Sequence, residues 1–140
     1  MRTTASSRAS PIDRVQALGG NAMLPWHACA LGHAIVAGLD DSAQEHLLAV
    51  PAQRLTGLTI VDAESLRNML ALTRQRGYAI EAHAATLGDA GIAAPVVDST
   101  GQVIGAIGIV GPAERVLAEE HLAAYAGSVC IAAEALSRTR

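Results

Sequence analysis

The chain lacks several residue types, and each absence narrows what it can be. Its 140 residues include no lysine, no phenylalanine and only three aromatic side chains, Trp26, Tyr78 and Tyr125. The net charge is −3, and the arginines are spread along the chain, so the basic stripe of a nucleic-acid-binding surface is missing. The shortage of aromatic side chains also removes the platforms on which unpaired bases stack.

Cysteines and long apolar runs are scarce as well. Cys29 and Cys130 lie far apart and form neither a disulfide framework nor a paired-cysteine zinc motif, so we expect a free-thiol protein of the cytoplasm. No apolar run approaches the roughly 18–20 residues of a membrane span, and we expect no membrane partner. Residues 1–23 are expected to form a flexible tail with a possible short strand over Ile12–Leu18.

The remaining composition is that of one globular domain. Hydrophobic residues make up 51% of the chain, which is too apolar for disorder, and the core must be built from Ala, Leu, Ile and Val. Capping residues and apolar spacing predict four helices. Asp62 precedes a periodic stretch that Gly77 ends, and Asp40–Ser42 offers caps before another. The predicted helices cover residues 27–37, 42–50, 63–76 and 113–137.

Three apolar stretches predict β-strands, over residues 78–82, 92–97 and 103–110. A turn with Gly101 joins the last two as a hairpin. Gly105 and Gly108 inside the third strand indicate that something packs close to its backbone. We therefore expect an α+β fold in which helices flank an antiparallel sheet.

The stretch Pro25–Ala34, PWHACALGHA, holds the densest group of reactive side chains. On a helix, Cys29 and His33 share a face, which suits two metal ligands or a thiolate–imidazole pair. Structural zinc needs four ligands, and only a distant residue such as His83 could add a third, so we expect core packing, no metal and no cofactor. No Ser/His/Asp set has a recognisable context, so we do not expect an enzyme.

Five segments, taken in order, indicate a family. They are LPWHACALGHA from Leu24, LTIVD from Leu58, RGYA from Arg76, GDAGIAAPV from Gly88, and IVGP ending at Pro112. Together they resemble the effector-binding domain of the IclR family of bacterial transcription factors. The resemblance implies a GAF-like fold and makes residues 24–138 the C-terminal part of that domain. Family members carry a winged helix-turn-helix ahead of it, which we do not expect within residues 1–23, so we expect no specific DNA binding by this chain.

The resemblance also implies a pocket for a small organic acid. Where the family has a cysteine and two serines, this chain has two glycines and a valine. We expect that loss to enlarge the pocket and to favour an apolar or aromatic acid, or no ligand at all. Carried over by position, the ligand-binding residues are Leu24, Trp26, Ala30, Leu31, Glu81, Asp89, Gly91, Gly108 and Val110.

Two functions from different classes stay open. The chain is either an effector-sensing module that acts on transcription through a partner, or a structural, vestigial fragment that only associates. In both cases the uncharged run Val103–Val110 is expected to be an unpaired sheet edge, because the family's neighbouring strands are not expected here. We expect this edge to pair with a second copy or with an intact paralogue.

Overall fold

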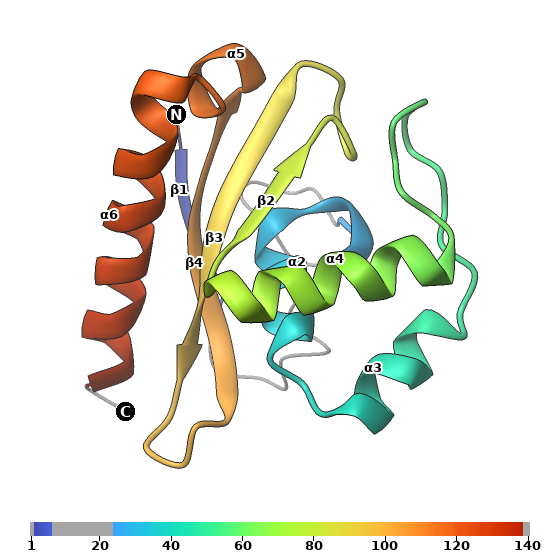
Figure 1. Ribbon diagram of the computed structural model, residues 1–140, viewed down its shortest axis with the longest axis horizontal. Coiled ribbons are helices and arrows are strands. Elements are labelled where there is room, and N and C mark those ends of the chain that lie inside the picture. The colour runs from blue at the N-terminus through green and yellow to red at the C-terminus, as the bar shows by residue number, and fades with distance from the viewer. Residues whose placement is uncertain (1, 7–23, 139–140) are drawn as a thin grey trace.

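A four-stranded antiparallel sheet forms the centre of the molecule, as a computed structural model shows (Figure 1). The structure describes residues 2–6, as backbone, and residues 24–138. Helix α6 (Glu119–Arg138) covers one face of the sheet, and α2 (Ala30–Ala37), α3 (Asp41–Leu48) and α4 (Ala63–Arg76) lie on the other side. The predicted α+β class is confirmed. The strands lie in the order β1 (Arg2–Ser6), β4 (Val103–Pro112), β3 (Asp89–Val97) and β2 (Ala79–Ala82).

Side-chain caps start two of the helices where the sequence predicts them. The Asp40 carboxylate accepts a hydrogen bond from the Ala43 amide at 2.8 Å, ahead of α3. Asp62 accepts one from the Ser65 amide at 2.9 Å, ahead of α4. Gly77 ends α4 with a φ of 89°, a left-handed conformation that glycine adopts without steric cost.

Two predicted helices are each divided in two. The first is a 3₁₀ turn, η1 (Trp26–Ala28), followed by α2, because Cys29 is extended with φ −143° and ψ 150°. A Cβ on Gly32 would lie 2.5 Å from Cα of Trp26, so only glycine lets η1 pack this closely on α2. The last helix divides at residues 117–118 into α5 (Ala113–Val116) and α6.

The sheet separates two hydrophobic clusters. One lies between the sheet and α2 and α4, with Ile35, Leu70 and Ala93 fully or almost fully buried. The other lies under α6 and α5. The inward residues predicted for the last helix are confirmed, since all of them pack in this second cluster: Leu117, Leu122, Ala126, Val129, Ala133 and Leu136.

Strand β1 corrects two expectations, one about the N-terminal residues and one about the edge of β4. It pairs antiparallel with β4, with Arg2 opposite Val110 and Ser6 opposite Ala106. Residues 2–6 are therefore a strand and not part of a flexible tail, and the prediction that Val103–Val110 has an unpaired edge is wrong. The strand predicted over Ile12–Leu18 lies outside the described residues. Within the described ranges, no helix is both long and apolar enough to cross a membrane.

Candidate functional site

The amino end of α2 lies against the middle of the sheet. Because Cys29 breaks the helix, α2 starts at Ala30, and the first amides of a helix have no partner within it. They carry the partial positive charge of the helix dipole and are suited to bind an anion. Ala30 and Leu31 are both buried, and a Cβ added to Gly91 would lie 3.2 Å from the Cβ of Ala30. The start of α2 is thus held directly over β3.

Three predicted residues form a row across the sheet beneath it. Glu81 of β2 is opposite Gly91 of β3, and Gly91 is opposite Val110 of β4. Residues opposite one another share a face of the sheet, and this face is the one that contacts Ala30. The structure therefore brings Ala30, Glu81, Gly91 and Val110 together from four elements.

Glu81 is the buried ionisable group of this row, with 8% of its surface exposed. Burial raises the pKa of its carboxyl to about 7, the backbone amides of Ala84 and Ala85 oppose that rise, and the negative charge of Asp89 adds to it. Its Oε1 accepts a hydrogen bond from the Ala84 amide at 2.7 Å. The side chain thus holds the loop after β2, and near neutral pH it is close to balance between its protonated and ionised forms.

Two threonines that the sequence analysis did not single out hold the same loop from the other side. Thr56 Oγ1 donates to the carbonyl of His83, and Thr59 Oγ1 donates to the carbonyl of Ala84, both at 2.6 Å. His83 itself has a φ of 61°, and its Nδ1 accepts from the Gly88 amide at 2.9 Å. The loop over the Glu81 end of the site is therefore tethered at several points. The one feature of the sequence that pointed toward these threonines was the family-like segment LTIVD, which contains Thr59.

Cys29 and His33 are core residues whose polar atoms bond locally. Burial raises the pKa of the Cys29 thiol to about 12, and its Sγ donates to the carbonyl of Pro25 at 3.6 Å. His33 Nε2 lies 2.7 Å from the carbonyl oxygen of His27, which can only accept, so Nε2 carries the proton. Within the described residues, Nδ1 of His33 has no hydrogen-bond partner, and burial lowers the pKa of the ring to about 4. No group of three or more His, Cys, Asp or Glu in residues 24–138 could hold a metal ion.

The other predicted residues lie around this row. Asp89 is half-buried at the start of β3, on the strand that carries Gly91. Leu24 is half-buried ahead of η1. The Trp26 ring stands edge-on to His33, with 6.5 Å between the ring centroids, and lines a pocket of about 340 Å³ beside α3 and residues 50–53. None of Ala30, Glu81, Gly91 and Val110 lines this pocket, so Trp26 borders a hollow separate from the row beneath the start of α2.

The two glycines do not enlarge the site, contrary to the expectation from the family resemblance. A Cβ on Gly108 would lie 2.5 Å from the carbonyl oxygen of Ile92, because β3 passes close to the backbone there. A Cβ on Gly91 would lie 3.2 Å from each of three atoms, one of them in the Val110 side chain. Backbone atoms leave no room for a Cβ at Gly108, and at Gly91 a Cβ would meet its neighbours in tight contact, so the two glycines open little space. The close packing predicted at Gly108 is confirmed.

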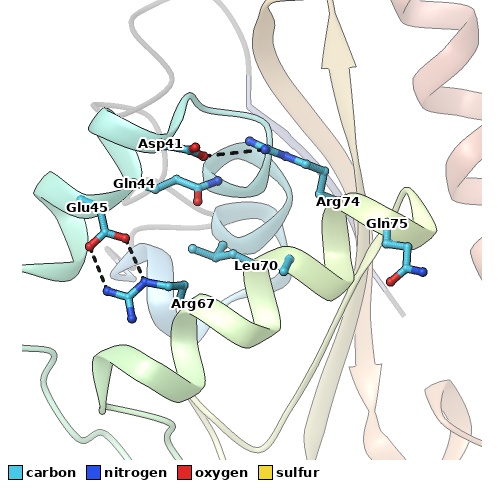
Figure 2. A pocket seen from close by; sticks show the side chains of 8 residues that line it. Asp41, Gln44, Glu45, Arg67, Leu70, Arg74 and Gln75 are labelled. Carbon is cyan, nitrogen blue, oxygen red and sulfur yellow. Dashed lines mark hydrogen bonds and ion pairs between the residues drawn. The ribbon is translucent and has the colours of Figure 1, made fainter.

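A larger hollow lies between α3 and α4, and its charged groups are already paired. This pocket of about 470 Å³ holds two ion pairs, in which Arg67 contacts Glu45 at 2.8 Å and Arg74 contacts Asp41 at 4.0 Å (Figure 2). Arg74 also donates to the carbonyls of Ala37 and Leu39, at the end of α2. These contacts tie three helices together, and the pocket offers no uncompensated charge to a ligand.

Comparison with known proteins identifies this architecture. Residues 8–138 match the family described as "Bacterial transcriptional regulator IclR C-terminal". The chain is 37% identical over 105 residues to the glycerol operon regulatory protein of Streptomyces griseus, an alignment that covers 75% of this chain and 41% of that protein. The chain thus spans less than half the length of this curated relative.

Solved structures agree with the family match. The C-terminal domain of the Escherichia coli transcriptional regulator KdgR has a TM-score of 0.82 and 25% identity, covering 97% of this chain and 85% of that one. The inducer-binding domain of the Acinetobacter transcription factor PobR, a double mutant in complex with 3-hydroxybenzoic acid, has a TM-score of 0.80 and 23% identity, covering 96% and 86%. These proteins are regulators of transcription and not enzymes. The chain belongs to the IclR family of bacterial transcriptional regulators, and the part of those proteins that it matches is their C-terminal domain.

Proposed function

We propose that this chain is an effector-binding domain that recognises a small organic acid at the amino end of α2. The observation that carries the proposal is the juxtaposition of the first α2 amides with Glu81 on the sheet face below them. The chain then acts on transcription in the cytoplasm through a partner that supplies DNA recognition.

The chemistry of the site favours a carboxylate. The first α2 amides are hydrogen-bond donors at the positive end of a helix dipole. Glu81 would repel a carboxylate when ionised, but the pKa of about 7 leaves it partly protonated near neutral pH, and the protonated form can donate to a carboxylate oxygen. Binding of an acid would therefore favour the protonated form of Glu81.

The rest of the surroundings favours an apolar body on that acid. Ala30, Leu31 and Val110 present no polar side-chain atoms, and the family's cysteine and serines are replaced here. An apolar or aromatic acid buries its hydrocarbon part against these residues, whereas a two- or three-carbon acid gains little from them. The proposal draws support from the double mutant of the PobR domain, a domain of this fold that was solved in complex with the aromatic acid 3-hydroxybenzoic acid.

A thermal-shift screen of carboxylic acids tests the proposal. We expect an aromatic or branched aliphatic acid to raise the melting temperature of the chain, and glyoxylate or pyruvate to raise it less. Glu81→Gln, which keeps the acceptor oxygen for Ala84, should change the shift given by the best acid. The exposed residue His121 provides the control, since His121→Gln should leave that shift unchanged.

Three results would contradict the proposal. If no acid changes the melting temperature, the chain is better explained as a structural fragment without a ligand. A larger response to a two-carbon acid would refute the apolar preference. A response abolished by Trp26→Leu and untouched by Glu81→Gln would put the ligand in the pocket beside η1, and not at the start of α2.

A further inference from the structure

The hollow of about 340 Å³ beside η1, called the η1 pocket below, has the size and the apolar lining of a small-molecule site. Leu48 of α3 and Leu66 of α4 line it, and both are buried. Val50 lines it as well and is 64% exposed, although it is a hydrophobic residue. A molecule in the η1 pocket would therefore cover apolar surface that now faces water.

Two polar atoms of η1 lack hydrogen-bond partners. His27 Nε2 lies 2.7 Å from the carbonyl oxygen of Gln53, which can only accept, so Nε2 carries the proton and Nδ1 of the neutral ring is an acceptor. Nε1 of Trp26 is a donor. Neither His27 Nδ1 nor Trp26 Nε1 has a partner among the described residues, although the two side chains belong to residues that are only 4% and 7% exposed.

These two atoms face open space at the η1 pocket. In the part of the chain that the structure describes, only Nδ1 of His33 is a side-chain atom that is both enclosed and unpartnered, so the free atoms of Trp26 and His27 are accessible. The η1 pocket is a hollow that both residues line. The indole is held edge-on to the rings of His27 and His33, with 6.2 and 6.5 Å between ring centroids. A fixed donor and a fixed acceptor thus share one wall of the pocket.

The lining of the η1 pocket selects against ions. Among the described residues that line it, none is Asp, Glu, Lys or Arg. A charged molecule would lose its hydration there without gaining an opposite charge. A hydroxyl group is uncharged and both donates and accepts, so one hydroxyl can satisfy the donor and the acceptor of η1 together.

We propose that the η1 pocket is a second ligand site and that it binds an uncharged aromatic hydroxyl compound, a phenol. The hydroxyl accepts from Trp26 Nε1 and donates to His27 Nδ1, and each bond satisfies an atom that is costly to leave unpaired. The ring packs on the apolar side chains of α3 and α4 and beside the indole, a contact that favours an aromatic ring. The site shares no residue with the row beneath α2, and the proposal does not rest on acid binding there.

Titration of the full chain with 4-methylphenol tests this inference. Trp26 is the one tryptophan of the chain, so its fluorescence reports on the η1 pocket. The probe has the chemistry of a tyrosine side chain and is uncharged at neutral pH. We expect a saturable change in the Trp26 emission. The ether 4-methylanisole can accept but not donate, and it should bind at least about fivefold more weakly because His27 Nδ1 stays unpaired.

Calorimetry of variants locates the bound phenol. Val50→Asp alters an exposed residue and should weaken the binding of 4-methylphenol at least about fivefold, because it removes an apolar contact and adds a charge at the pocket. Leu58 is 58% exposed, does not line the pocket and gives a matched control, since Leu58→Asp should leave the affinity unchanged. Trp26→Phe keeps a ring but removes the donor, and it should also weaken binding. Circular dichroism verifies that each variant is folded.

Each measurement has an outcome that overturns the proposal. The absence of a saturable fluorescence change excludes the site. Equal affinities for 4-methylphenol and 4-methylanisole contradict the role of the hydroxyl, and equal effects of Val50→Asp and Leu58→Asp put the phenol elsewhere. Displacement of the phenol by the matched acid 4-methylbenzoate would show that both occupy one site. Binding of 4-methylphenol by a chain that binds no acid would support this proposal alone.

Discussion

Glu81 and His33 are buried ionisable residues whose pKa values move in opposite directions. Burial raises the pKa of Glu81 from its ordinary value of 4.5 to about 7 and lowers that of His33 from 6.5 to about 4. Between pH 4.5 and 7, the folded chain keeps a proton on Glu81 that the unfolded chain releases. The contribution of Glu81 to the free energy of unfolding therefore falls as pH rises through this range. His33 is neutral when folded and protonated when unfolded, so its contribution rises from pH 4 to 6.5.

In the native chain, the pH dependence that Glu81 gives to the free energy of unfolding should therefore largely cancel the one that His33 gives. In Glu81→Gln the contribution of His33 remains, and we expect the free energy of unfolding to increase by about 3 kcal/mol between pH 4 and 6.5. In His33→Gln the contribution of Glu81 remains, and the free energy should decrease by a similar amount between pH 4.5 and 7. Urea titrations at a series of pH values measure both slopes. Equal slopes in the native chain and in Glu81→Gln would contradict the pKa shift of Glu81.

Individual site residues were only partly predictable from the sequence. The resemblance to the family selected Glu81, Gly91 and Val110, and the apolar pattern placed Glu81 and Val110 on strands and Gly91 just ahead of one. The register brings the three residues into one row. It could not show that Glu81 bonds to the Ala84 amide, because that bond depends on the path of a tethered loop. Nor could it show that the spaces beside Gly91 and Gly108 are filled, since that depends on how closely β3, β4 and α2 approach one another.

At the scale of elements, α4 is a helix whose two ends are both marked in the sequence. Its cap at Asp62 and its end at Gly77 are local signals, so the sequence predicts both boundaries. The breaks at Cys29 and at residues 117–118 carry no proline or helix-ending glycine, and they arise from packing that local sequence does not encode. Strand β1 was missed because it forms only by pairing with β4, a hundred residues later in the chain.

Two leucines on α4 test how this helix is held in the domain. Leu70 is 1% exposed within the cluster beneath α2, and Leu72 is 50% exposed on the opposite side of α4. We expect Leu70→Ala to lower the free energy of unfolding by about 2–5 kcal/mol, because it leaves a cavity. Leu72→Ala should change it by less than about 0.5 kcal/mol. Chemical denaturation of both variants makes the comparison, and similar losses would contradict the burial of this face.

At the scale of the whole molecule, the chain has the sensing domain's fold and an overall negative charge. The net charge is −3, and three of its arginines, Arg67, Arg74 and Arg138, are engaged in ion pairs. Neither feature suits the phosphate backbone of DNA, whose contacts depend on clustered positive charge. The net charge follows from composition and needs no knowledge of the fold, whereas the ion pairs depend on it.

We accordingly expect the chain by itself to show no specific DNA binding. Mobility-shift assays with DNA from upstream of its own gene, at about 200 mM salt where weak phosphate contacts are largely lost, provide the measurement. Any shift at low salt should be competed away equally by unrelated DNA. A sequence-specific shift that persists at the higher salt concentration would contradict this expectation.

The central claim is that an organic acid binds at the amino end of α2, and the backbone amide signals of that helix report on it directly. A ¹⁵N-labelled sample is titrated with the acid that gives the largest thermal shift. We predict saturable shifts of the Ala30, Leu31 and Gly91 amide resonances, with the amide of Leu72 on α4 unchanged. Saturable shifts confined to residues outside this site, or no shifts in the presence of that acid, would contradict the account.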